Sequence, residues 1–215
     1  YSSAASDVYK RQIKEERFNP MGVSDAELAE LHAKKFAVMD DAVGEKMQER
    51  ILQAKSELNS VGGVIEAIAL HLPAGIGAPY FDSVESMLSH ALFSVPAVKG
   101  VEFGDGFGFA GLTGAEANDA LHYVDGRVQA LTNHNGGITG GITNGMPLVV
   151  RVAIKPTPSI AREQHTVSLK EQADTTLAIV GRHDPCIVQR AVPVIEAVVA
   201  WTLWDLLLEA KKWEK

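Results

Sequence analysis

The chain has 215 residues, 46% of them hydrophobic and 22% charged, which is typical of a globular protein with one sizeable core. Its net charge is −7 at pH 7 and its basic residues are scattered, which excludes the clustered positive surface that nucleic-acid binding requires. A single cysteine, Cys186, excludes an intrachain disulfide framework and favours a reducing, cytoplasmic compartment.

The beginning of the sequence differs from the rest. Residues 1–12, YSSAASDVYKRQ, show no apolar stripe and no turn pattern. We expect residues 1–21 to form a non-native or disordered leader and residues 22–215 to form one domain. No signal peptide is evident, and the apolar stretch at 191–208 is interrupted by Glu196 and Asp205. Because a membrane span needs about 20 largely uncharged residues, we expect no transmembrane helix.

Two helices are predicted next. Ser24 and Glu27 have the spacing of a capping box, in which a hydroxyl and a carboxylate satisfy the first free amides of a helix. Apolar residues then recur at helical spacing, namely Leu28, Leu31, Phe36 and Met39, followed by Val43, Met47, Ile51, Ala54 and Leu58. The pair Gly62 and Gly63 is expected to end this helical region.

The remaining elements are mixed. Apolar and β-branched runs predict strands at 64–72, 98–103 and 148–154, with a shorter one at 177–180. Asp82 and Glu85 indicate the cap of a helix that ends at Phe93, whereas residues 114–126 are polar and are expected to form a surface loop. A helix over 192–210, initiated by Pro193, is apolar nearly all round and should be buried on more than one face. Strands and helices do not alternate strictly, so the pattern favours an α+β fold with helices packed on antiparallel sheets.

Some motifs resemble sites but lack the required context. Gly106 to Gly111 matches the dinucleotide pattern GxGxxG, but no apolar helix follows it, so a glycine-rich turn is favoured. Cys186 lies three residues after His183, yet no oxyanion-hole pattern accompanies them, and a buried packing role is favoured for the cysteine. The histidines show no HxxH or HExxH pairing, so no metal site is predicted. Trp201 and Trp204 are interpreted as packing residues.

Three segments of the second half are candidates for binding an anionic ligand. The first, residues 133–145, contains five glycines between 136 and 145, which fits either a turn or a close backbone approach to a ligand. The second is Lys155-Pro156-Thr157-Pro158-Ser159, either a strand exit or a phosphate grip of one cation and two hydroxyls. The third contains Arg182 and Asp184, either a salt-bridged helix cap or an anion-binding arginine beside a proton acceptor.

These segments, in this order, resemble the chorismate synthase family. The sequence GRHDPCIVQRAVPVIEA at 181–197 is similar to its C-terminal signature. NHNGGITGGITNGMP at 133–147 and VRVAIKPTPSI at 150–160 are similar to its glycine-rich loop and flavin-binding segment. PAGIGAPYFD at 73–82 and AVKGVEFGDGF at 97–107 also fit. The resemblance runs from about residue 22 to the C-terminus and corresponds to the C-terminal portion of the family.

The resemblance implies a partial β-α-β sandwich, a homotetramer when full length, and a carbon–oxygen lyase that uses reduced FMN. The implied reaction is the 1,4-anti elimination of phosphate from 5-enolpyruvylshikimate 3-phosphate, which gives chorismate for aromatic amino-acid biosynthesis, with the flavin lending an electron transiently. Asp184 matches the family carboxylate near flavin N5, a catalytic role in removal of the C6 hydrogen. The implied FMN-binding positions are Pro96, Ala97, Gly140, Lys155, Pro156, Thr157, Pro158, Ser159 and Arg182.

The sequence departs from the family in two respects. Pro96 stands where many members carry Asn, which removes a side-chain donor to the flavin, while Gln189 and Asn135 are smaller departures. The family's N-terminal section, with its Gly-Glu-Ser-His-Gly loop, substrate-binding arginines and second catalytic histidine, has no counterpart here. We therefore expect the chain alone to have little or no activity. No residue is assigned to an NADP-linked flavin reductase activity.

Two alternatives remain. One is a non-catalytic fragment that binds flavin or phosphate weakly or not at all, which the unrelated leader favours. The other, if the resemblance is set aside, is an anion-binding α+β module without enzymatic activity. Coupled binding of reduced FMN and the phosphorylated substrate would identify the enzyme, because a simple binding module requires no such coupling.

Overall fold

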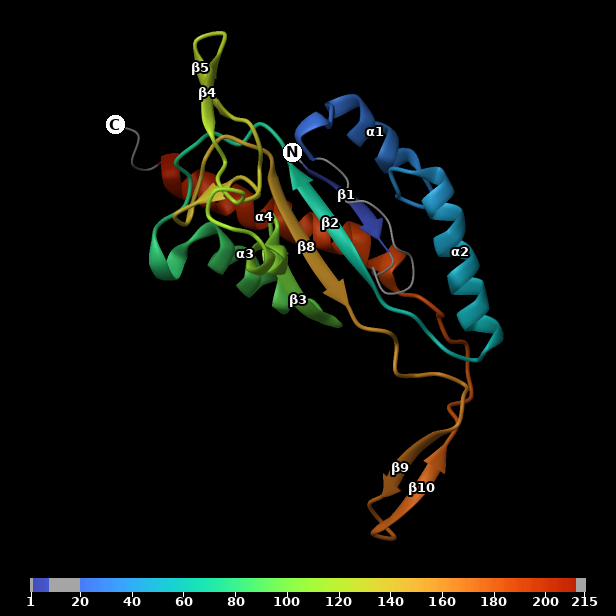
Figure 1. Ribbon diagram of the computed structural model, residues 1–215. Coiled ribbons are helices and arrows are strands. Elements are labelled where there is room, and N and C mark those ends of the chain that lie inside the picture. The colour runs from blue at the N-terminus through green and yellow to red at the C-terminus, as the bar shows by residue number, and fades with distance from the viewer. Residues whose placement is uncertain (1, 8–19, 212–215) are drawn as a thin grey trace.

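A four-stranded antiparallel sheet with the order β1-β2-β8-β3 lies at the centre of the computed structural model, which describes residues 2–7 and 20–211 (Figure 1). Two helices, α3 and α4, pack on one face of this sheet, and α1 packs on the other. The strands of the sheet are β1 (Ser2–Asp7), β2 (Gly63–Ala69), β3 (Val98–Phe103) and β8 (Leu148–Ile154). The helices are α1 (Asp25–Ala33), α2 (Asp41–Ser56), α3 (Val84–Phe93) and α4 (Val188–Lys211). The α+β class with antiparallel sheets is confirmed.

Capping hydrogen bonds fix where the first two helices begin. The Ser24 hydroxyl and the Glu27 carboxylate form the predicted capping box at α1. The carboxylate of Asp40 accepts hydrogen bonds from the amides of Ala42 and Val43 and so caps α2. Helix α1 ends at Ala33, so the prediction that Phe36 extends its apolar face is wrong, and so is the same prediction for Met39. Likewise Leu58 lies beyond α2 and is 56% exposed.

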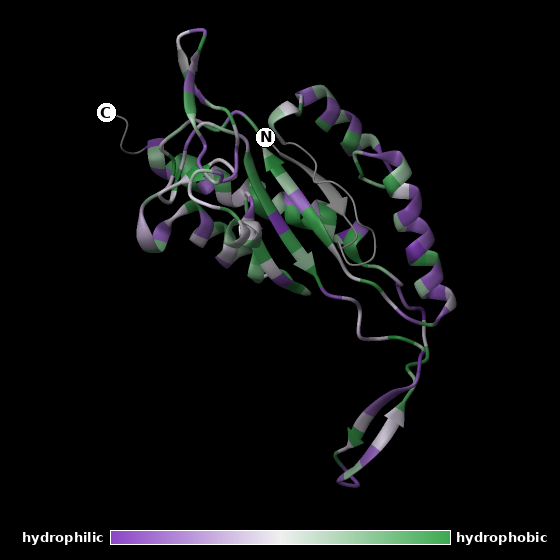
Figure 2. Cartoon of the chain, viewed as in Figure 1, coloured by the Kyte–Doolittle hydropathy of each residue, from purple (hydrophilic) through white to green (hydrophobic). Residues whose placement is uncertain are grey.

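The main core lies between the sheet and the layer of α3 and α4. Alternate residues of the two central strands point into it, because side chains alternate between the faces of a strand. These residues, together with those that meet them from the helices, are fully or nearly buried: Ile65, Ala67, Ala69, Leu148, Val150, Val152, Leu88, Leu92, Ile195 and Val199. Figure 2 shows β2 and β8 as mainly hydrophobic bands beside more polar outer segments. This core fixes where each strand ends, and therefore where the loops meet.

The opposite face of the sheet is mixed. Ile68 and Val149 pack there against Leu28 of α1. Further along this face, Arg151 of β8 forms an ion pair of 3.0 Å with Glu102 of the neighbouring strand β3. The guanidinium is largely buried and also donates to the backbone carbonyl of Gly104. A cation buried in this way needs such partners, because an unpaired charge away from water is costly.

Helix α4 is longer than predicted and carries apolar residues on two sides. It begins at Val188, so Pro193 lies inside the helix and does not initiate it. Its inner face packs on the sheet, whereas its outer face exposes Val194, Trp201, Trp204 and Leu208, with Trp201 78% exposed. The packing role predicted for both tryptophans is therefore not seen within the described chain. By length and composition alone α4 could cross a membrane, but its inner face is part of the core, and core helices of soluble proteins pass the same test.

Short elements complete the fold, and several correct the predictions. The 3-10 helix η3 (Gly106–Gly111) confirms that the GxGxxG match opens no α-helix. The region predicted as a loop, residues 114–126, contains β4 (Leu121–Val124) and the turn at Asp125 and Gly126, both with positive φ. This turn connects β4 to β5 (Arg127–Ala130), with which β4 pairs. The short strand predicted at 177–180 is wrong except for Leu177, which is the last residue of β10 (Ala173–Leu177). Strand β10 pairs with β9 (Gln164–Ser168). The other short elements are η1 (Pro20–Gly22), η2 (Tyr80–Asp82), β6 (Ile138–Thr139) and β7 (Ile142–Thr143).

Part of the predicted leader contributes to the sheet. Residues 2–7 form β1, which pairs antiparallel with β2 as an outer strand, although the sequence predicted no element there. Residues 8–19 lie outside the described residues, so the prediction of a leader over 1–21 falls largely outside them. Ser83, and not Asp82, caps α3 through a hydrogen bond from the amide of Ser86.

Candidate functional site

Two chain segments run side by side where β9 and β10 leave the body of the molecule (Figure 1). We call residues 155–159 and 182–185 the neck, and residues 160–180 the arm. The peptide of Ser60 and Val61 lies against both sides of the neck. The Ser60 hydroxyl donates to the carbonyl of Thr157 at 2.6 Å, and the amide of Val61 donates to the carbonyl of Pro185 at 2.8 Å. The second and third candidate segments are thereby held next to each other.

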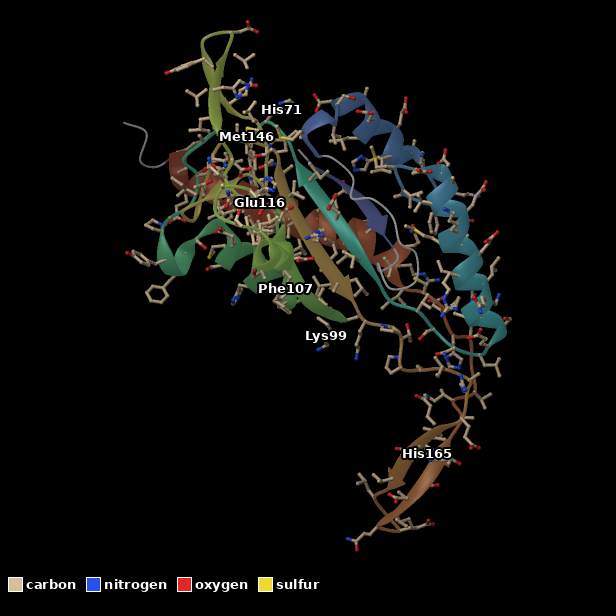
Figure 3. All side chains as sticks on the ribbon, in the orientation of Figure 1. His71, Lys99, Phe107, Glu116, Met146 and His165 are labelled. Atoms are coloured by element: carbon tan, nitrogen blue, oxygen red, sulfur yellow. The ribbon has the colours of Figure 1, made fainter. Side chains whose placement is uncertain are left out.

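Lys155 follows directly after β8. Its amide donates to the carbonyl of Ala97 at 2.9 Å, which places the pair Pro96 and Ala97 beside the lysine. Ala97 has a φ of 73°, a conformation that non-glycine residues rarely adopt. The Lys155 side chain is exposed at this end of the sheet. Figure 3 shows Lys99 at the same end of β3, so a second cation lies on the strand that neighbours β8.

Ser159 and His183 connect the two sides of the neck. The Ser159 hydroxyl lies 3.4 Å from Nδ1 of His183, and Nε2 of the same ring lies 2.9 Å from the carbonyl of Ile179. A carbonyl oxygen only accepts, so Nε2 carries the hydrogen and, in the neutral ring, Nδ1 accepts from the serine. His183 thus orients Ser159 and is not directed at Cys186.

Thr157 has an unusual hydroxyl. Its Oγ1 is buried and has no hydrogen-bond partner among the described residues. Most buried polar side-chain atoms are satisfied, so such an atom often marks a position where a ligand or ordered water binds. With the Lys155 ammonium and the Ser159 hydroxyl in the same segment, the donor set suits a phosphate group. The residues therefore fit the phosphate end of FMN.

The other side of the neck supplies Arg182 and Asp184. Arg182 is exposed. Asp184 Oδ2 lies 2.9 Å from Nη1 of Arg190 in the first turn of α4, and the Asp184 side chain is 32% exposed. This geometry is the salt-bridged arrangement that the sequence left open as one interpretation of the segment. The ion pair leaves the Asp184 carboxylate beside the neck, where it remains accessible to solvent.

Gly140 lies apart from the other candidates. It is in the turn between β6 and β7, and the next residue, Gly141, accepts a hydrogen bond from the amide of Val84 at the start of α3. Pro96 and Ala97 follow the other end of this ten-residue helix, which is roughly 15 Å long. The glycines of the loop therefore serve at least as tight turns, and Gly140 is not adjacent to the neck.

The rest of the glycine-rich segment is anchored by Asp119. Its carboxylate accepts hydrogen bonds from the Thr132 hydroxyl, the His134 amide, and the amide and side chain of Asn135, at 2.8–3.0 Å. Burial raises the pKa of Asp119, but these hydrogen bonds outweigh it and lower the pKa overall. Nδ1 of His134 lies 2.5 Å from the carboxylate of Asp105. The loop that precedes β8 is therefore held in one conformation by a half-buried carboxylate.

The two remaining sequence predictions concern cysteine and metals. Cys186 packs against the main core, and burial raises the pKa of its thiol, so it is a packing residue as predicted. Within residues 2–7 and 20–211, no group of three His, Cys, Asp or Glu side chains could hold a metal ion.

Sequence reasoning missed three contributors to the neck. Ser60 and Val61 carry no motif, and only the structure places them against Thr157 and Pro185. His183 was weighed only as a partner of Cys186. Its hydrogen bond to the carbonyl of Ile179 lies in a loop, where no sequence pattern indicates it.

Comparisons with known proteins agree with this geometry. A family model described as chorismate synthase matches residues 5–208. The chorismate synthase of Thermococcus gammatolerans is 51% identical over 175 residues, which are 81% of this chain and 49% of that protein. That of Crocosphaera subtropica is 45% identical over 203 residues, 93% of this chain and 55% of that protein. A crystal structure of chorismate synthase superposes with a TM-score of 0.74 at 29% identity, covering 97% of this chain and 57% of the other.

Proposed function

Because the chain belongs to the chorismate synthase family, we propose that it is the C-terminal portion of such an enzyme and carries part of its site for reduced FMN. The chain spans about half the length of the curated relatives that it matches. The complete enzyme would act as a carbon–oxygen lyase that eliminates phosphate from 5-enolpyruvylshikimate 3-phosphate to give chorismate. The observation that carries this proposal is the neck, where a lysine, a serine and an unsatisfied threonine hydroxyl lie in one segment.

In this proposal the neck binds the phosphate of FMN. Lys155 supplies the positive charge, and the hydroxyls of Thr157 and Ser159 donate hydrogen bonds. The prolines 156 and 158 limit the backbone freedom between these donors. Pro96, Ala97 and Arg182 would line the flavin, and Gly140 would contribute from the other end of α3. Reduced FMN, when bound, supplies an electron transiently to the elimination.

Asp184 is proposed to take part in removing the hydrogen from C6 of the substrate, while phosphate leaves from C3. Its ion pair with Arg190 fixes the direction of the carboxylate. A charged partner of this kind positions a proton acceptor, which must lie within hydrogen-bond reach of the proton that it removes. Arg190 is therefore a positioning residue in this scheme.

The proposal extends to assembly and location. We propose that the complete protein is a cytoplasmic homotetramer. We also propose that residues 1–215 alone have little or no lyase activity, because the substrate-binding arginines and the second catalytic histidine of the family lie outside them. Turnover by residues 1–215 at a rate comparable to an intact relative would contradict the last point.

A titration with reduced FMN tests the site. Lys155→Ala should weaken FMN binding about tenfold or more, because a hydrogen bond to a charged group contributes about 1.5–3 kcal/mol. Lys170→Ala is the matched control, since Lys170 is also exposed but lies in the turn of the arm. FMN binding that is equal in both variants would remove Lys155 from the site.

A second titration separates the enzyme from a simple binding fragment. In the enzyme, 5-enolpyruvylshikimate 3-phosphate should raise the affinity for reduced FMN, because the two ligands share one site and their coupling is reciprocal. FMN binding that ignores the phosphorylated substrate would favour the non-catalytic flavin- or phosphate-binding fragment.

A further inference from the structure

Strand β3 contains a β-bulge at the end of the sheet where the neck begins. Val98 of β3 pairs with Ile154 of β8. The next pair joins Gly100 to Ala153, so Lys99 is an extra residue on its strand. Bulges are frequent beside functional sites, where they redirect a side chain. The position of Lys99 is therefore a feature of the backbone and not a chance of side-chain orientation.

The bulge lets the core and the lysine be accommodated together. Val98 and Val101 both pack against the main core, although they are three positions apart. Side chains alternate along a regular strand, so without the bulge only one of these valines could face the core. Lys99 is exposed. Figure 3 shows it at the end of β3 that lies beside the exit of β8 into the neck.

Lys155 lies on the strand next to Lys99. The amide of Lys155 donates to the carbonyl of Ala97, so these two residues are opposite each other just beyond the pair of Val98 and Ile154. Each lysine directly follows one of these two core residues, so alternation directs both lysines to the opposite face of the sheet. They are diagonal neighbours, with Cβ atoms roughly 7–8 Å apart, a spacing that long side chains bridge.

The two ammonium groups have no acidic partner among the residues that the structure describes. Glu102, further along β3, is already paired with Arg151 at 3.0 Å. Two like charges at this spacing repel each other, although water weakens the repulsion. An anion bound between the lysines would attract both of them and remove this cost. A dianion would match their combined charge.

We propose that Lys99 is a second phosphate-binding cation of the neck, which together with Lys155 selects a dianionic phosphate monoester. The inference rests on the proposed function, because the monoester is the terminal phosphate of FMN, and it adds the charge state in which that phosphate is bound. A phosphate monoester carries its second negative charge above about pH 6. Riboflavin has no phosphate, so it lacks the group that both lysines would contact. Charge-assisted hydrogen bonds to phosphate are stronger than those between neutral groups.

The ratio of the affinities for reduced FMN and reduced riboflavin isolates the contribution of the phosphate. Lys99→Gln should lower this ratio about three- to tenfold, because one charge-assisted contact is lost at an exposed position. Lys99→Arg keeps the positive charge and should retain most of the ratio. Lys170→Gln is the matched control, since it removes the same charge from the turn of the arm. Anaerobic isothermal titration calorimetry of the four chains measures the ratios.

The pH dependence of FMN binding tests the charge state. Between about pH 7.5 and about pH 5 the phosphate takes up its second proton. The unmodified chain should therefore lose affinity for FMN over this range, and Lys99→Gln should lose less, because it no longer contacts the second charge. His183, which orients Ser159, also titrates in this range. It is present in both chains, so the difference between their profiles reports on Lys99. Parallel profiles would contradict the selection of the dianion.

Comparison with Lys155→Ala separates the inference from the proposed function. If Lys155→Ala lowers the ratio and Lys99→Gln does not, the inference is wrong and the phosphate site of the neck stands. If neither substitution changes the ratio, or the unmodified chain does not prefer FMN to riboflavin, both are wrong.

The outer position of β3 in the sheet offers another role for Lys99, because lysines and bulges protect edge strands from pairing with other chains. In that case Lys99→Gln would leave the ratio unchanged and increase association of the chain with concentration. Sedimentation equilibrium of the unmodified chain and of Lys99→Gln detects this result, which would overturn the inference.

Discussion

The body and the arm use the same antiparallel pairing but obtain their stability from different sources. In the body, β2 and β8 lie between two layers, and residues such as Ile65, Leu148 and Val152 are completely buried. In the arm, β10 has no buried residue. Hydrogen bonding between strands is common to both regions, so what distinguishes them is the removal of apolar surface from water. The comparison shows that the body is specified by its own packing, whereas the arm has no comparable core among the described residues.

Truncating one leucine in each region should give the largest contrast. Leu88 of α3 is fully buried in the main core, whereas Leu169 at the tip of the arm is 88% exposed. We expect Leu88→Ala to lower the free energy of unfolding by about 2–5 kcal/mol, since it leaves a cavity. Leu169→Ala should change it by less than about 0.5 kcal/mol. Urea denaturation followed by circular dichroism measures both, and similar losses would remove the distinction.

Removing one carboxylate from each region extends the comparison to polar groups. Asp119 accepts four hydrogen bonds in the body, and Asp174 is an exposed residue of the arm. Asp119→Ala should cost about 2–3 kcal/mol, because part-buried amides lose a charged acceptor. Asp174→Ala should be close to neutral. The pKa of Asp119 is lowered on folding, so its contribution should disappear as the pH falls through the folded value. Urea titrations of both variants at neutral and acidic pH check this.

The junction between the two regions can be tested at Gly62. A Cβ added there would lie 2.4 Å from the carbonyl oxygen of Ile154 and 3.0 Å from Pro156. We expect Gly62→Ala to shift the strand exit, reduce stability by about 1–2 kcal/mol and weaken FMN binding. Gly114→Ala is the control, because nothing lies within 4 Å of its Cβ position. Equal FMN affinities for the two variants would show that the neck tolerates this displacement.

The smallest effect concerns the contact between α1 and α4. A hydrogen bond from His32 to Glu196 raises the pKa of His32, partly opposed by burial. Because the folded value is raised, this contact stabilises the chain fully below the ordinary histidine value of about 6.5 and loses its effect as the pH rises through the folded value. The stability difference between the unmodified chain and His32→Gln should therefore shrink from about pH 6 to pH 8. Urea midpoints at both values measure it, and a difference that grows would contradict the assignment.

The body was more predictable from the sequence than the arm for a physical reason. Strands β3 and β8 were predicted with their observed bounds. In β8 the signal is an apolar run that only Arg151 interrupts, which is typical of a buried strand. Strand β9 was missed, since an exposed strand has no core to impose such a pattern and Val167 is its only strongly apolar residue. The turn at Asp125 and Gly126 was available as a signal and was overlooked.

The candidate site was predictable as a set of residues but not as an arrangement. Lys155, Ser159 and Asp184 were selected from their chemistry and their likeness to the family. Their neighbours, such as Ser60, lie nearly 100 positions away from Thr157 in the sequence and carry no local pattern. The start of α4 was misplaced because a proline was expected at the first turn, whereas Pro193 sits inside the helix.

The hydrogen bonds around Ser60 and Val61 have a consequence for communication within the molecule. The residues of the neck that would bind a phosphate also connect the arm to the body of the molecule. A ligand that immobilises Lys155 and Ser159 would reduce the conformational freedom of the arm. Conversely, if another contact immobilised the arm, the side chains of Lys155 and Ser159 would already be ordered when the ligand binds. Linkage requires the two effects to be equal in free energy, so flavin occupancy and the order of the arm would each report on the other.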